Sequence, residues 1–107
     1  MPKYLFQGRY TAEGLKALHS DTAVSRRASL IKTIEALGGK LEAAYWCFGE
    51  NDTLGVADLP DNVSAATFAL ACSIGGNINV KTVALLTAEE LDQALQKTTP
   101  LRPHGSN

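Results

Sequence analysis

The sequence predicts an α+β domain in which one four-stranded antiparallel sheet packs against helices. Three observations lead to this prediction. Two segments with helical spacing of apolar residues each end at a Gly-Gly pair, at 38–39 and 75–76, and each pair is followed by a strand-like run. Two apolar runs flank the stretch 49–52, whose residues are typical of a hairpin turn. The expected order is strand, helix, strand, strand, helix, strand.

The N-terminal part is expected to form one strand and two helices. Residues 4–10 are rich in aromatic side chains, which favour a strand. A short helix then begins at Thr11, a break follows near Ser20, and a longer helix ends at Leu37, where Gly38 can adopt the left-handed conformation. On the longer helix the apolar residues share one half of the helical wheel: Ala23, Val24, Ala28, Leu30, Ile31, Ile34 and Leu37.

Arg27 falls near the middle of this apolar half. An inward guanidinium is costly unless it is paired, which leaves two alternatives. Either Arg27 bonds a carboxylate or an anionic ligand, or its charged end extends to solvent past the end of the helix, as long basic side chains commonly do.

The central hairpin is expected to join a strand over 41–48 to a strand over 54–57 through the turn 49–52. Asn51 and Asp52 suit this turn because both tolerate positive φ and bond locally to the backbone. Strict alternation in the first strand places Leu41, Ala43, Tyr45 and Cys47 on one face, and Glu42, Ala44, Trp46 and Phe48 on the other. Both faces are mostly apolar near the turn.

The C-terminal part begins with a helix that Asp61 is expected to cap after Pro60. This helix runs to about Ile74, and a strand over 78–86 follows the second glycine pair. Thr87 and Glu90 form a capping-box pattern for a short final helix to about Lys97, which we expect to cover the aromatic ring of Phe68. We expect one domain over 1–97 and a flexible tail over 98–107.

This order of elements is that of the split βαβ, or ferredoxin-like, sandwich. Helices on one side would cover only one face of the sheet, yet the predicted strands are apolar on both faces. The second face is therefore expected to be buried against another copy or beneath a ligand. A homo-oligomer, most simply a two-fold dimer, is the expected assembly.

Composition excludes several functional classes. The net charge of −1 lacks the basic excess of proteins that bind nucleic acid or anionic membranes, so neither partner is expected. The N-terminus has no long apolar run, which favours a cytoplasmic protein. The cysteines Cys47 and Cys72 and the histidines His19 and His104 lack the spacing of metal ligands. No metal and no cofactor are expected.

The motifs of the chain resemble those of the GYD-domain family. These are Gly38-Gly39-Lys-Leu, then Phe48-Gly49-Glu-Asn-Asp52, Val56-Ala-Asp-Leu-Pro-Asp61, Phe68-Ala-Leu70 and Gly76-Asn77. In the sequence Gly-Tyr-Asp that gives the family its name, Gly49 and Asp52 match, whereas Asn51 stands where tyrosine is usual. Asp58 stands where a glutamate is common. The resemblance covers the chain to about Leu95 and implies a dimeric α+β barrel type of architecture, without a particular activity. It also implies that Arg26 or Arg27 is the counterpart of an arginine that family members often carry early in the long helix.

Two functional classes remain open. The first is a small oligomeric ligand-binding or accessory module, with Tyr4, Phe6, Trp46 and Phe48 as pocket walls and Arg27 or Lys81 as a polar anchor. The second is a small cofactor-free enzyme, similar to monooxygenases and isomerases built on dimeric α+β barrels, for which fold analogy is the whole argument. Asp52 is expected to serve the turn, with an acid/base or ligand-binding role as the alternative.

Overall fold

The computed structural model describes residues 1–97, so the expected tail over 98–107 lies outside the described residues. The elements follow in the order β1 (Lys3–Tyr10), α1 (Ala12–His19), α2 (Ala23–Ala36), β2 (Lys40–Trp46), β3 (Thr53–Asp58), α3 (Asn62–Ile74), β4 (Ile78–Leu85) and α4 (Ala88–Gln96). None of the helices within residues 1–97 combines the length and apolarity that crossing a bilayer requires.

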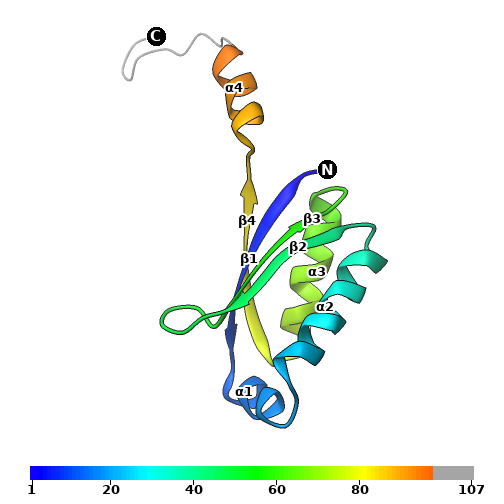
Figure 1. Ribbon diagram of the computed structural model, residues 1–107, viewed down its shortest axis with the longest axis vertical. Helices are drawn as coiled ribbons and strands as arrows, with labels where there is room; N and C mark the ends of the chain where they lie inside the picture. Colours follow the sequence, from blue (N-terminus) through cyan, green and yellow to red (C-terminus); the bar gives the residue numbers. More distant parts are fainter. Residues whose placement is uncertain (98–107) are drawn as a thin grey trace.

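The strands form one antiparallel sheet in the order β2-β3-β1-β4, and α2 and α3 lie against the same face of it (Figure 1). The predicted α+β, ferredoxin-like fold is therefore confirmed. We call the face beneath α2 and α3 the inner face. Cross-strand register places on it Tyr4, Phe6, Gly8 and Tyr10 of β1, Thr53, Gly55 and Ala57 of β3, and Ile78, Val80, Thr82 and Ala84 of β4. The opposite, outer face includes Leu5, Leu54, Val56, Val83 and Tyr45.

Local sequence signals set the ends of the helices. The side chains of Thr11, Thr22, Asp61 and Thr87 each accept a backbone N–H bond at the start of a helix. Gly38, with φ of 82°, ends α2, where its N–H donates to Glu35 and the N–H of Gly39 donates to Ile34. The predicted helix starts and glycine stops are confirmed.

The core lies between the inner face and the two helices. Its buried residues are Tyr4, Phe6, Ile34, Ala57, Leu59, Ala65 and Phe68. The rings of Phe6 and Phe68 meet edge to face with their centroids 4.7 Å apart. The predicted cover of Phe68 by the final helix is wrong, because β4 carries α4 away from the body of the domain (Figure 1) and every residue of α4 is exposed.

The face of α2 that is buried in the structure differs from the apolar half predicted from the helical wheel. Ile34 is fully buried and Leu30 is half-buried, but Val24 is 67% exposed and Arg27 is exposed. Residues 26, 30 and 34, which recur every four residues, are the best-buried positions of α2 and border the space above the sheet, so Arg26 faces inward in the place expected for Arg27. The wheel pattern was too broad to define this row, since alanines and valine widened its apolar side.

The hairpin between β2 and β3 turns through residues 47–52. The turn is confirmed, but positive φ occurs at Gly49, with φ of 121°, and at no non-glycine residue within residues 1–97. The expectation of positive φ at Asn51 and Asp52 is wrong because the loop is long enough for the glycine alone to adopt the left-handed conformation. Asp52 instead bonds to β1: its N–H donates to the Gly8 carbonyl, and its carboxylate accepts from the Tyr10 N–H, each at 2.9 Å.

Candidate functional site

A cavity of about 330 Å³ lies between the inner face and helices α2 and α3, partly open to solvent. Its apolar lining comprises Phe6, Leu30, Ile34, Leu41, Phe68, Ala71, Ile78 and Val80. Its polar lining comprises Tyr10, Arg26, Ser29, Thr33, Trp46, Thr53, Cys72 and Asn77. Phe6, Ile34 and Phe68 belong to the core as well, so the cavity is continuous with the buried core of the domain.

Two glycines, Gly8 and Gly55, form part of the cavity floor. A Cβ atom at Gly8 would lie 2.5 Å from the Thr53 side chain and 2.6 Å from that of Ile78, so the strands leave no room there. A Cβ atom at Gly55 would meet no atom closer than the Ala43 carbonyl oxygen at 3.8 Å. The space above Gly55 is therefore part of the cavity, and it exists because this inner-face position has no side chain.

A β-bulge in β2 brings Leu41 and Trp46 into the same cavity. Leu41 pairs with Ala57, but the next paired residue is Ala43, so Glu42 is extra in the ladder. The extra residue inverts the alternation after Leu41 and turns Trp46 to the inner face. Strict alternation had placed Leu41 and Trp46 on opposite faces, and that expectation is wrong for this reason.

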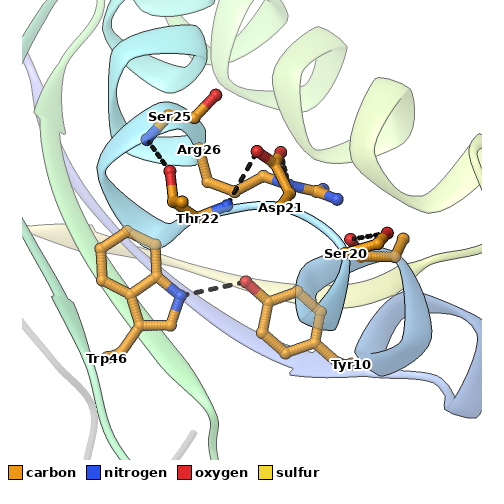
Figure 2. A network of polar contacts seen from close by, with 8 residues as sticks. Tyr10, Ser20, Asp21, Thr22, Ser25, Arg26 and Trp46 are labelled. Carbon is orange, nitrogen blue, oxygen red and sulfur yellow. Dashed lines mark hydrogen bonds and ion pairs between the residues drawn. The ribbon is translucent and has the colours of Figure 1, made fainter.

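Tyr10 and Trp46 are joined by a hydrogen bond at one end of the cavity (Figure 2). The indole Nε1–H of Trp46 donates to the Tyr10 hydroxyl oxygen at 3.1 Å. The hydroxyl thereby serves as acceptor, and its own hydrogen remains available to a ligand. Tyr10 is fixed from behind by the bond of its backbone N–H to Asp52, which links the hairpin to the position of this hydroxyl.

Arg26 adds a charged group to the cavity from the end of the first turn of α2. Its Nε–H donates to the Asp21 carboxylate at 2.9 Å, and Figure 2 shows the guanidinium lying alongside Asp21. The Thr22 N–H donates to the same carboxylate at 2.8 Å. These two donors, the Thr22 N–H first, hold the pKa of Asp21 below its ordinary value. Asp21 therefore stays ionised and fixes the direction of the Arg26 side chain.

The cavity offers few groups for acid/base or nucleophilic chemistry. Within residues 1–97 its lining includes no carboxylate and no imidazole. Burial raises the pKa of the Cys72 thiol, which keeps that group in its less reactive protonated form. In the same part of the chain no group of three or more His, Cys, Asp or Glu residues is arranged to hold a metal ion.

The structure brings two of the residues proposed from the sequence, Phe6 and Trp46, together in the cavity wall. Tyr4 lies deeper in the core, where its hydroxyl bonds the Asn62 side chain at 2.6 Å. Phe48 is 98% exposed at the hairpin, and Arg27 is exposed on α2.

Two more of these residues lie elsewhere. Asp52 lies at the base of the hairpin, bonded to β1. Lys81 lines a second, smaller depression with Gln7, Arg9 and Asn79.

Sequence reasoning did not assign Tyr10 to the site, and it named Arg26 only through the family resemblance. The signal for Arg26 was its spacing of four and eight residues from Leu30 and Ile34, the two best-buried apolar positions of α2. Tyr10 ends a strand whose residues 4, 6 and 8 face inward, and period two therefore places it on the same face.

Comparison with known proteins gives one match. The family model of the GYD domain matches residues 4–95. Neither the curated proteins nor the solved structures include a match to the chain. Because the family match extends from β1 into α4, the chain belongs to the GYD domain family.

Proposed function

We propose that this protein is a small-molecule binding module whose ligand occupies the cavity between the inner face and helices α2 and α3. The observation that supports this proposal is a cavity of about 330 Å³ whose lining surface is mostly apolar. Ligand sites in proteins typically enclose roughly 300–1,000 Å³, with apolar walls and a few polar groups that orient the ligand. The cavity is at the small end of this range and has polar groups of this kind in Tyr10, Trp46 and Arg26.

Binding is favoured over a cofactor-free enzymatic activity by the chemistry of the lining. Proton transfer in enzymes is most often performed by histidine or a carboxylate. Neither occurs in the lining formed by residues 1–97. Arginine remains protonated in proteins, and the Cys72 thiol has a raised pKa. This set of groups suits recognition of a ligand better than its conversion.

The test uses Trp46, the only tryptophan of the chain, as a reporter inside the cavity. Titration with 1-octanol should produce a saturable change in Trp46 fluorescence. Gly55→Val should weaken this binding by at least roughly tenfold, because its side chain fills space that the ligand needs. Ala84→Val, at an exposed position of β4 outside the cavity, is the matched control and should bind as the unmodified protein does. Equal binding by a folded Gly55→Val variant would contradict the proposal.

We also propose that two copies associate through their outer faces. Leu5, Leu54 and Val56 are only half-buried there, Val83 is 40% exposed and Tyr45 is 70% exposed. An apolar sheet face of this kind is normally covered, and a two-fold axis would bring two identical faces together. The exposed leucines of α4, Leu91 and Leu95, add further uncovered apolar surface.

A further inference from the structure

The charge of the cavity lining comes from a single residue. Among the residues that line it within the described part of the chain, Arg26 is the only one with an ionised side chain, and the other polar groups are neutral hydroxyl, amide, indole and thiol groups. Asp21, the partner of Arg26, is not among the lining residues. A ligand in the cavity therefore meets one guanidinium and no carboxylate in the wall, while the ionised Asp21 lies outside the lining, 2.9 Å from Arg26 Nε.

The geometry of the Arg26–Asp21 pair leaves most of the guanidinium available. The pair is made through Nε, at 2.9 Å from the Asp21 carboxylate. A guanidinium has five N–H donors in a fixed planar arrangement, and four of them are on the two terminal nitrogens. Asp21 thus orients the side chain (Figure 2) without occupying the terminal nitrogens, which are the atoms that bind a carboxylate in the bidentate manner.

Tyr10 supplies a second donor to the same cavity. Its hydroxyl oxygen already accepts from Trp46, and its own hydrogen is available for donation to a ligand. A cationic or purely donating ligand would find few partners at this end of the cavity. An ionised acceptor would be bound by both side chains.

We propose that the cavity is selective for small monocarboxylates, with the apolar body of the ligand against Phe6, Phe68 and Leu30 and its carboxylate bonded to Arg26 and Tyr10. This inference depends on the proposed function and specifies its ligand class. A single carboxylate fits better than the dianion of a phosphate ester, because Asp21 already offsets the charge of Arg26 and the remaining lining is neutral. The site therefore offers directed N–H donors to one planar carboxylate, and no excess positive charge for a dianion.

The test compares three probes that share one chain length: octanoate, 1-octanol and octylammonium, each titrated calorimetrically at neutral pH. Octanoate should bind roughly tenfold or more tightly than 1-octanol, which is the usual scale for a hydrogen bond to a charged group. Octylammonium should bind most weakly, since its charge lies next to Arg26 and it offers no acceptor.

Substitutions at single residues identify which side chains cause the preference for octanoate over 1-octanol. Arg26→Gln should abolish the advantage of octanoate over 1-octanol, Arg26→Lys should keep part of it, and Tyr10→Phe should reduce it. Arg27→Gln, at the adjacent exposed position, is the matched control and should retain the full preference. The Trp46 indole N–H resonance provides a second readout, because it is bonded to the Tyr10 oxygen and should shift on addition of octanoate.

Equal affinity for octanoate and 1-octanol, or a preference that survives in Arg26→Gln, would overturn the monocarboxylate inference and leave the binding proposal intact. If none of the three probes binds, the proposed function itself is wrong, and the inference is wrong with it. The two failures are thus distinguishable.

Discussion

At the floor of the cavity, Gly8 and Gly55 lie in neighbouring strands on the same face of the sheet, and they lack side chains for different reasons. Gly8 allows Thr53 and Ile78 to approach each other across β1. Gly55 leaves open space that nothing in the fold requires. Steric need explains the first glycine. Ligand binding is our explanation for the second.

This difference predicts opposite effects of alanine on stability. Gly8→Ala should destabilise the protein by about 1–3 kcal/mol, the usual cost of overpacking. Gly55→Ala should be neutral or stabilising by about 0.5–1 kcal/mol, because its φ is not positive and alanine restricts the unfolded chain. Urea unfolding of both variants measures the contrast, and a loss of stability in Gly55→Ala comparable to that in Gly8→Ala would show that the space is not free.

Asp52 influences the cavity by holding the backbone of Tyr10, whose N–H donates to the Asp52 carboxylate. Asp52→Ala leaves the Tyr10 backbone N–H without its acceptor, and we expect a loss of about 1–2 kcal/mol of unfolding free energy. Asp52→Asn retains an acceptor oxygen and should lose less. Trp46 fluorescence in the native state should change more in Asp52→Ala than in Asp52→Asn, since the Tyr10 hydroxyl is bonded to the indole. Identical stabilities for the two variants would argue against this role.

At the scale of the elements, the sequence predicted what local chemistry determines. The threonine and aspartate caps and the glycine stop at Gly38 depend only on residues a few positions away. They can therefore be predicted from the sequence alone. The rotation of α2 and the bulge at Glu42 depend on how the element packs against the sheet. These tertiary effects decided that Arg26, and not Arg27, lines the cavity, and that Trp46 shares the inner face with Leu41.

The start of α3 should make stability depend on pH. The Ser64 N–H donates to the Asp61 carboxylate at 2.8 Å, and this bond, followed by one from the Ser64 side chain, lowers the pKa of Asp61 from its ordinary 3.8. A carboxyl whose folded-state pKa is lowered stabilises the folded state above its ordinary pKa. This contribution is lost as pH falls from 3.8 through the lower folded-state value.

Asp61→Asn should therefore reduce the slope of unfolding free energy against pH between about pH 5 and pH 2, while its amide oxygen still caps the helix. The slope should not vanish, because the pKa of Asp21 is lowered in the same direction. Urea titrations at several pH values compare the variant with the unmodified protein. An unchanged slope would mean that the Asp61 bond contributes nothing measurable to stability.

At the scale of the whole molecule, the two sheet faces differ in what covers them. The inner face is covered by α2 and α3 (Figure 1). The outer face carries a row formed by the half-buried Leu5 and Val56 and the exposed Val83. The sequence indicated an apolar second face, because the predicted strands carry apolar residues on both sides. The cavity itself was not predictable, because its space arises from the absence of a side chain at Gly55 and from the placement of two helices.

The proposed assembly predicts a dimer of twice 11.4 kDa in sedimentation equilibrium at micromolar concentration. Val83→Glu should shift the equilibrium toward the monomer, because it places a charge on the outer face. Thr82→Glu is the matched control: Thr82 is also exposed in β4, but it points to the opposite face. A single 11.4 kDa species for the unmodified protein would refute the dimer.

The most direct test of the binding site is a map of where a ligand contacts the protein. In a two-dimensional NMR titration with octanoate, we expect the largest shifts at Gly55, Cys72 and the Trp46 indole, which line the cavity, and small shifts at Leu54 and Val83 on the outer face. Shifts confined to the outer face, or no saturable shifts at the cavity residues, would contradict the proposal that this cavity binds small molecules.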